Sequence, residues 1–203
     1  MRETRWHREY AMEEPKSFYH ESKFADGSAV ITLDELERES PTWSDWERVD
    51  FCQEVGFNTS PELPNILRFV MKNGERDHWS AIAMNVVAVI PPDEAIPFLF
   101  EAYSRCEIGE ASNILQALAK SGAPEAHKIH RDYLRQLWAK PDLFKEERHF
   151  NHLAAEAVHC IRHQLGLGEP LSDFKEELEA LAVHPNEANR TMVKNLIERY
   201  GAR

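Results

Sequence analysis

Five histidine and glutamate residues recur at helical spacing in one segment of the sequence, residues 147–165. On a helix with 100° per residue they fall together on the side opposite the apolar residues: His149, His152, Glu156, His159 and His163. Imidazoles three and four residues apart can share a metal ion, and Glu156-x-x-His159 matches half of a carboxylate-bridged di-iron pattern. A di-iron site needs a second such pair on a facing helix, and Glu146-x-x-His149 begins this same helix. We therefore expect a partly solvated recognition face with no bound metal.

Sequence motifs for nucleophilic catalysis or phosphate binding do not occur in the chain. The patterns G-x-S-x-G, G-x-x-x-x-G-K-S/T and G-x-G-x-x-G are missing. Asp77, His78 and Ser80 are close in sequence but point to different sides of one helix, so they do not form a triad. His130 falls within an apolar arc, which indicates a hydrogen-bonded, half-buried side chain. We predict no catalytic residue and no cofactor.

The elements that must position these residues are helices. Apolar residues at helical spacing, with capping and breaking residues between them, predict eight helices in four hairpins after about residue 60. Their expected ranges are 60–73, 77–90, 93–105, 108–121, 124–141, 147–165, 172–184 and 186–200. The expected caps are Ser60, Asp77, Ser172 and Asn186 at N-termini and Gly122 after a C-terminus.

The starts of the first three hairpins repeat along the chain. Pro61, Pro92 and Pro124 lie about 31 residues apart, and Pro61 and Pro124 precede Glu while Pro92 precedes Asp. Such a period of helix pairs is typical of a solenoid. At 92–99 and 117–126 the chain resembles the short HEAT-like repeats also found in phycobilin lyases. The resemblance implies an all-α fold, an α-α superhelix of about four hairpins in a repeat domain at 60–203, with the second helix of each hairpin on the concave side.

The first 59 residues do not fit the repeat and are interpreted as an irregular, partly helical N-terminal cap. Residues 28–33 suit either a short strand or an extended lead into a helix at Asp34, and we favour the lead. Ser44 is expected to cap a helix that carries Trp46 and Phe51. Solenoids need atypical ends to cover their exposed apolar faces, which is the role expected for this segment.

Composition limits the class of protein. The chain has 203 residues with 42% hydrophobic and 29% charged, in the range of a single soluble domain. The charged N-terminus lacks an apolar signal region, and the three cysteines, Cys52, Cys106 and Cys160, form no C-x-x-C pair. We therefore expect a cytoplasmic protein with reduced thiols and no association with membranes.

The net charge of −11 favours a basic partner and disfavours nucleic acid, because neutralising phosphates takes clustered Lys and Arg. Eight acidic residues lie in one run of the sequence that contains only two arginines. They are Asp34, Glu35, Glu37, Glu39, Asp45, Glu47, Asp50 and Glu54. Such a run is usually a solvated face, and the alternative is a docking patch for a basic protein.

The leading functional hypothesis is a non-enzymatic scaffold, adaptor or inhibitor that binds a basic protein, for example an immunity protein that neutralises a toxin. Its binding surface is expected on the second helices. The residues predicted there, besides the five of segment 147–165, are His78, Asn85, Asn113, Gln116 and Lys120, followed by Glu187, Thr191, Lys194 and Glu198.

Two enzymatic alternatives remain open. A metal-dependent oxygenase similar to deoxyhypusine hydroxylase would use His-Glu dipeptides on several repeats, but the one such dipeptide, His20-Glu21, lies outside the repeats. A nucleic-acid enzyme resembling the HEAT-like alkylpurine DNA glycosylases would need a basic groove, and the predicted surface residues supply few cations.

Overall fold

The computed structural model describes residues 31–55, 61–139 and 147–201, and the side chains of 147–152 are left out of the description. Within these ranges the chain forms ten α-helices and no strand. Their bounds are α2 Leu33–Glu39, α3 Asp45–Glu54, α4 Leu63–Asn73, α5 Arg76–Val89, α6 Pro92–Arg105, α7 Ser112–Ser121, α8 Ala126–Trp138, α9 Glu147–Gly166, α10 Lys175–Ala182 and α11 Glu187–Tyr200. Short 3-10 turns at Ile108–Glu110 and Leu171–Phe174 precede α7 and α10. The all-α class is confirmed.

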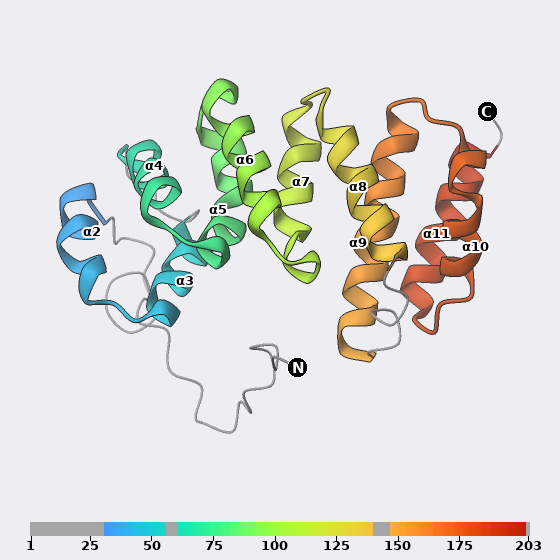
Figure 1. Cartoon of the computed structure of the whole chain (residues 1–203), viewed down its shortest axis with the longest axis horizontal. Coiled ribbons are helices and arrows are strands. Elements are labelled where there is room, and N and C mark those ends of the chain that lie inside the picture. The colour runs from blue at the N-terminus through green and yellow to red at the C-terminus, as the bar shows by residue number, and fades with distance from the viewer. Residues whose placement is uncertain (1–30, 56–60, 140–146, 202–203) are drawn as a thin grey trace.

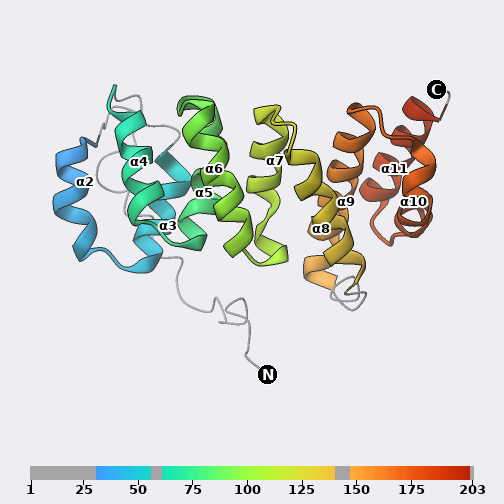
Figure 2. The same cartoon turned by 45° about the horizontal axis from the view of Figure 1, so that its top comes forward.

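The helices form one elongated row in chain order, from α2 at one end to α10 and α11 at the other (Figures 1 and 2). Neighbouring antiparallel helices pack as four pairs: α4 with α5, α6 with α7, α8 with α9, and α10 with α11. The second members of these pairs also pack on one another, from α5 to α7 to α9 to α11. Helices α2 and α3 add to the same arrangement, because α2 packs on α4 and α3 packs on α5.

Several predicted helix starts are correct, and those that differ have a local reason. Ser44 and Asn186 cap α3 and α11 with their side-chain oxygens. Ser60, the cap predicted for the first hairpin, lies outside the described residues. Asp77 does not cap α5, because Glu75 is the N-cap of that helix and its backbone N–H donates to the His78 side chain. Helices α7 and α10 begin later than predicted because 3-10 turns precede them, and Ser172 lies inside the second of these turns.

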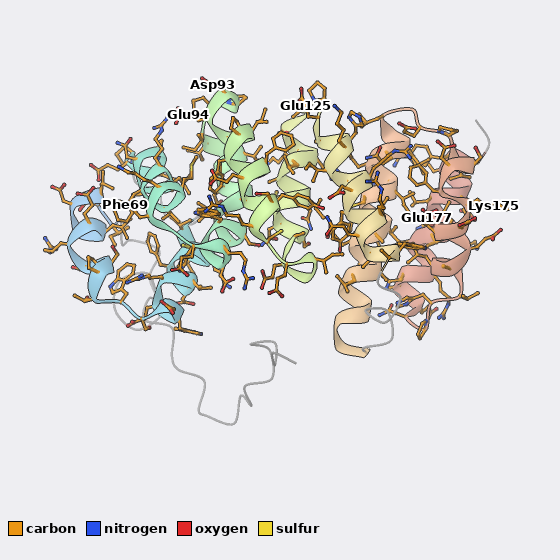
Figure 3. The ribbon with its side chains drawn as sticks, in the orientation of Figure 1. Phe69, Asp93, Glu94, Glu125, Lys175 and Glu177 are labelled. Carbon is orange, nitrogen blue, oxygen red and sulfur yellow. The ribbon has the colours of Figure 1, made fainter. Side chains whose placement is uncertain are left out.

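The repeating prolines lie at or just before the first turns of helices, as predicted. Pro92 is the first residue of α6, and Pro61 and Pro124 lie in the turns that lead into α4 and α8. Proline is tolerated there because its missing N–H has no helical partner. Asp93, Glu94 and Glu125 mark the starts of α6 and α8 at the same upper edge of the row (Figure 3). Pro97 lies inside α6, within the range predicted for this helix.

The core consists of two clusters of buried residues along the row, and both clusters include residues of α7. Ile114 and Leu118 of α7 belong to a buried cluster that extends back to Ile31, while Leu115 belongs to a second cluster that extends to α11. The predicted core stripe of α5 is confirmed, since Trp79, Ile82, Val86 and Ile90 are all buried. Helix α7 is therefore shared between the two clusters.

The acidic run at 34–54 owes part of its composition to the starts of α2 and α3. Glu35 and Glu47 complete capping boxes with Thr32 and Ser44, and Asp34 and Asp45 lie in the first turns. Carboxylates are stabilised at these positions by the unpaired N–H groups of the helix start. The Ser44 interactions accordingly lower the pKa of Glu47. Four of the eight acids in the run are thus explained by their positions at helix starts.

None of the helices in the described part of the chain has the length and apolar character needed to cross a membrane.

We expect Gly122→Ala to lower the free energy of unfolding by about 1–2 kcal/mol, because Gly122 ends α7 with a φ of 66°, where a Cβ is strained. The matched control is Gly166→Ala at the end of α9. A Cβ at either position meets no described atom within 4 Å, and only Gly122 has a positive φ. Chemical denaturation measures both, and equal stabilities of the two variants would contradict the assignment.

Candidate binding groove

A groove of about 530 Å³ lies over the second helices of the hairpins. Its lining comes from α5, α7, α9 and α11, with one residue from α8. The lining residues are Met84, Leu115, Gln116, Ala119, His130, Glu156, His159, Arg162, His163, Gly166, Leu167, Arg199 and Tyr200. Four residues of the predicted binding surface therefore line the same groove: Gln116 from α7, and Glu156, His159 and His163 from α9.

The other predicted binding residues do not line this groove. Asn113 and Lys120 are exposed on α7, and Asn85 is half-buried on α5, outside the lining. The side chains of His149 and His152 lie outside the described residues. On α11 the exposed Thr191, Lys194 and Glu198 likewise fall outside the groove, and Arg199 and Tyr200 take their place.

His78 was predicted on an exposed surface, and this prediction is wrong. Its side chain is only 5% exposed, and its Nδ1 accepts the backbone N–H of Glu75 at 2.8 Å. Burial lowers the pKa of His78. The residue helps to begin α5 and is turned into the protein, which a helical-wheel angle alone does not reveal.

Glu156 was also predicted on a solvated face, and it is 3% exposed. Its Oε2 accepts the hydroxyl of Ser112 at 2.6 Å, and Gln116 Nε2 donates to the same Ser112 oxygen at 3.1 Å. Because Ser112 is the first residue of α7, the carboxylate lies at the positive end of that helix. Glu156 therefore joins α9 to α7 beneath the groove.

We expect Ser112→Ala to cost about 1–3 kcal/mol of unfolding free energy, because it removes the hydrogen bond that Glu156 receives and leaves the buried carboxylate without that donor. The control is Ser104→Ala, whose exposed hydroxyl donates to the Glu101 carbonyl of its own helix. Denaturant unfolding compares the two variants. Equal losses would show that the contact between α7 and α9 contributes nothing particular.

His130 and His163 form the floor of the groove next to Arg162. Their ring centroids are 4.3 Å apart. The buried His130 ring places Nδ1 2.7 Å from the Ala126 carbonyl and Nε2 3.1 Å from the Leu115 carbonyl, which confirms a hydrogen-bonded histidine. These carbonyls favour the charged ring, but burial is the larger effect and lowers the pKa of His130 to about 4.

His163 is less enclosed than His130 and has an unpaired ring nitrogen. Burial lowers the pKa of His163, and the nearby His127 lowers it further. Its Nε2 is inaccessible to solvent and has no hydrogen-bond partner among the described residues. The His163 ring therefore keeps one nitrogen whose hydrogen-bonding capacity no described residue uses.

Arg162 and Arg199 are the groove residues that the sequence prediction missed. Arg162 lies only 60° from His159 on the helical wheel, so the same arithmetic would have included it had the selection not been confined to histidine and glutamate. Arg199 lies one position beyond the predicted residue Glu198, so α11 contributes a different side to the groove from the one predicted. Its guanidinium lies 5.5 Å from the ring centroid of Tyr200.

Metal ligation finds no support within the described residues. No group of three or more His, Cys, Asp or Glu side chains there is placed to hold a metal ion. The three cysteines are free thiols, as predicted. Cys52 and Cys160 are buried, and Cys106 is half-buried. Burial raises the pKa of Cys52 to about 12 and that of Cys106 to about 11, so neither thiol is activated as a nucleophile.

Comparisons of the chain with models of known protein families, with curated proteins and with solved structures find no match.

Proposed function

We propose that this chain is a protein-binding scaffold, built as a HEAT-like α-α superhelix whose concave side is the groove over α5, α7, α9 and α11. The observation that carries the proposal is the composition of the groove wall. Four successive hairpins each contribute their second helix to it. A surface built in this way is extended along the array and suits a large partner.

The superhelical interpretation is supported by the packing of the two helix series. From α5 onward the second helices pack on one another, while the first helices pack on second helices, as α6 does on both α5 and α7. Closer packing on one side of a stacked array is what curves it toward that side. Helices α2 and α3 add to the same arrangement before residue 60, because α2 packs on α4 and α3 packs on α5.

Binding is favoured over catalysis by the state of the polar groups in the groove. The buried carboxylate, Glu156, is engaged by Ser112 and is therefore committed to holding α9 on α7. Met84 and Leu167 add apolar surface to the lining that carries the charged residues. Apolar wall with dispersed polar groups is the composition of a protein-binding surface.

A toxin-neutralising immunity protein is one concrete form of this function, and a basic partner follows from the net charge of −11. That charge argument concerns the long-range field of the whole molecule. It applies most directly to the acidic run on α2 and α3, where half of the carboxylates lie in the first turns of the helices.

Site-specific photocross-linking in the cells that make the protein tests the proposal. A photoreactive amino acid replaces Gln116 in the groove, and in the control it replaces Gln136, an equally exposed glutamine of α8 that does not line the groove. We expect a discrete protein adduct at position 116 and none at 136. Adducts at neither position, or the same adducts at both, would reject the groove as a protein-binding surface.

A further inference from the structure

We propose that the groove binds an acidic, partly apolar segment of its protein partner, whose carboxylates are held by Arg162 and Arg199. This inference rests on the proposed function, since it names the chemistry of the partner segment at the same site. It concerns the local charge of the groove, which differs in sign from the charge of the chain.

The local charge is set by the residues that line the groove. Two arginines, Arg162 and Arg199, face a single carboxylate, that of Glu156. The Glu156 carboxylate is already satisfied in part by Ser112 and by the start of α7. In a chain with a net charge of −11, this groove is therefore a cationic region.

Arg162 and Arg199 have no carboxylate partner among the described residues, a property that they share with Arg48 and Arg190 outside the groove. Most arginines in the described part of the chain form ion pairs, as shown by Arg38, Arg68, Arg76, Arg105, Arg131 and Arg135. Arg162 and Arg199 form none with the described residues, although acids outnumber bases in the chain by 35 to 24. Their guanidinium groups thus keep the planar donor pairs that bind carboxylates in a bidentate manner.

The remaining lining fits a peptide better than a small anion. Met84 and Leu167 offer apolar contacts in the lining, and Leu167 is 60% exposed. The ring of Tyr200 lies beside Arg199 and adds an aromatic surface. The exposed His159 provides a further polar contact. A segment that carries both acidic and apolar side chains would match this set of contacts.

Panning short random peptides displayed on phage against the purified full-length chain tests the charge of the segment. We expect the selected peptides to be enriched in Asp and Glu together with apolar residues. The double variant Arg162→Glu/Arg199→Glu should lose this preference and bind the selected peptides at least about tenfold more weakly, since about 1.4 kcal/mol corresponds to a factor of ten. Arg135→Glu, at an exposed arginine of α8 outside the groove, is the control and should bind them unchanged.

The outcomes separate this inference from the proposed function. Selection of basic or uncharged peptides, no enrichment, or an acidic preference that survives the charge reversal would each overturn the acidic segment. If a fluorescent oligonucleotide or inorganic polyphosphate binds more tightly than the selected peptides and is lost in the double variant, the arginines serve phosphate and the inference also fails. A protein adduct at position 116 would leave the scaffold function standing in all of these cases.

Discussion

Replacing Trp79 with alanine is expected to lower the free energy of unfolding by about 3–5 kcal/mol, as for a large aromatic residue removed from a core. Trp79 is 6% exposed at the start of the α5 core stripe. Its ring meets Phe98 of α6 edge-on at 5.8 Å, and the Arg105 guanidinium lies 5.0 Å above it. The substitution therefore opens a cavity between the two hairpins α4–α5 and α6–α7.

Denaturant unfolding of the wild-type chain and the variant measures this loss. The control is Trp46→Ala, which removes a tryptophan that is 43% exposed on α3 and should cost much less. Similar losses for the two tryptophans, or a loss below about 1 kcal/mol at position 79, would show that Trp79 does not hold the hairpins together.

Acidification is expected to destabilise the protein through His130. Burial lowers the pKa of His130 to about 4 from an ordinary 6.5. The unfolded chain therefore binds a proton that the folded chain excludes between these values. Stability is complete above about pH 6.5 and is lost as the pH falls toward 4. By linkage, His130 alone removes about 2 kcal/mol between about pH 7 and pH 5.

His78 and His163 act in the same direction, because burial lowers the pKa of both. Unfolding free energies at about pH 7 and pH 5 should therefore differ by about 2 kcal/mol or more in the wild type. In His130→Gln, whose amide can still donate to one carbonyl, the difference should shrink by about 2 kcal/mol. His159→Gln, at an exposed histidine, should leave it unchanged. A difference that is the same in all three proteins would refute the assignment to His130.

The helices and their apolar faces could be predicted from the sequence because both depend on local signals. The stripe from Trp79 to Ile90, the cap at Asn186 and the glycine end of α7 at Gly122 follow from spacing and residue type alone. These features are set within one helix and its immediate neighbours in sequence. Predicted starts were wrong where a 3-10 turn precedes the helix, as at Ser172 and before α7, and where another residue is the cap, as Glu75 is in place of Asp77.

The groove was predicted in outline, and its details depend on contacts between helices. The second helices were expected to supply the surface, and Gln116, Glu156, His159 and His163 do line one groove. The burial of Glu156 could not be predicted, because a helical wheel gives the direction of a side chain and not what lies there. The start of α7 covers that side of α9, and the Ser112 hydroxyl donates a hydrogen bond to the carboxylate. Arg199 likewise lines the groove because of how α11 packs on α9, which the sequence of α11 alone does not reveal.

The central claim, that a protein occupies the groove over the second helices, is tested most directly by the affinity of the cross-linked partner for a variant whose groove is filled. Ala119→Trp places a large uncharged side chain in the groove wall, and Ala180→Trp places the same side chain on the exposed face of α10. With the purified partner, we predict at least about tenfold weaker binding for Ala119→Trp, a loss of about 1.4 kcal/mol, and wild-type affinity for Ala180→Trp. Wild-type affinity of a folded Ala119→Trp variant would contradict the account.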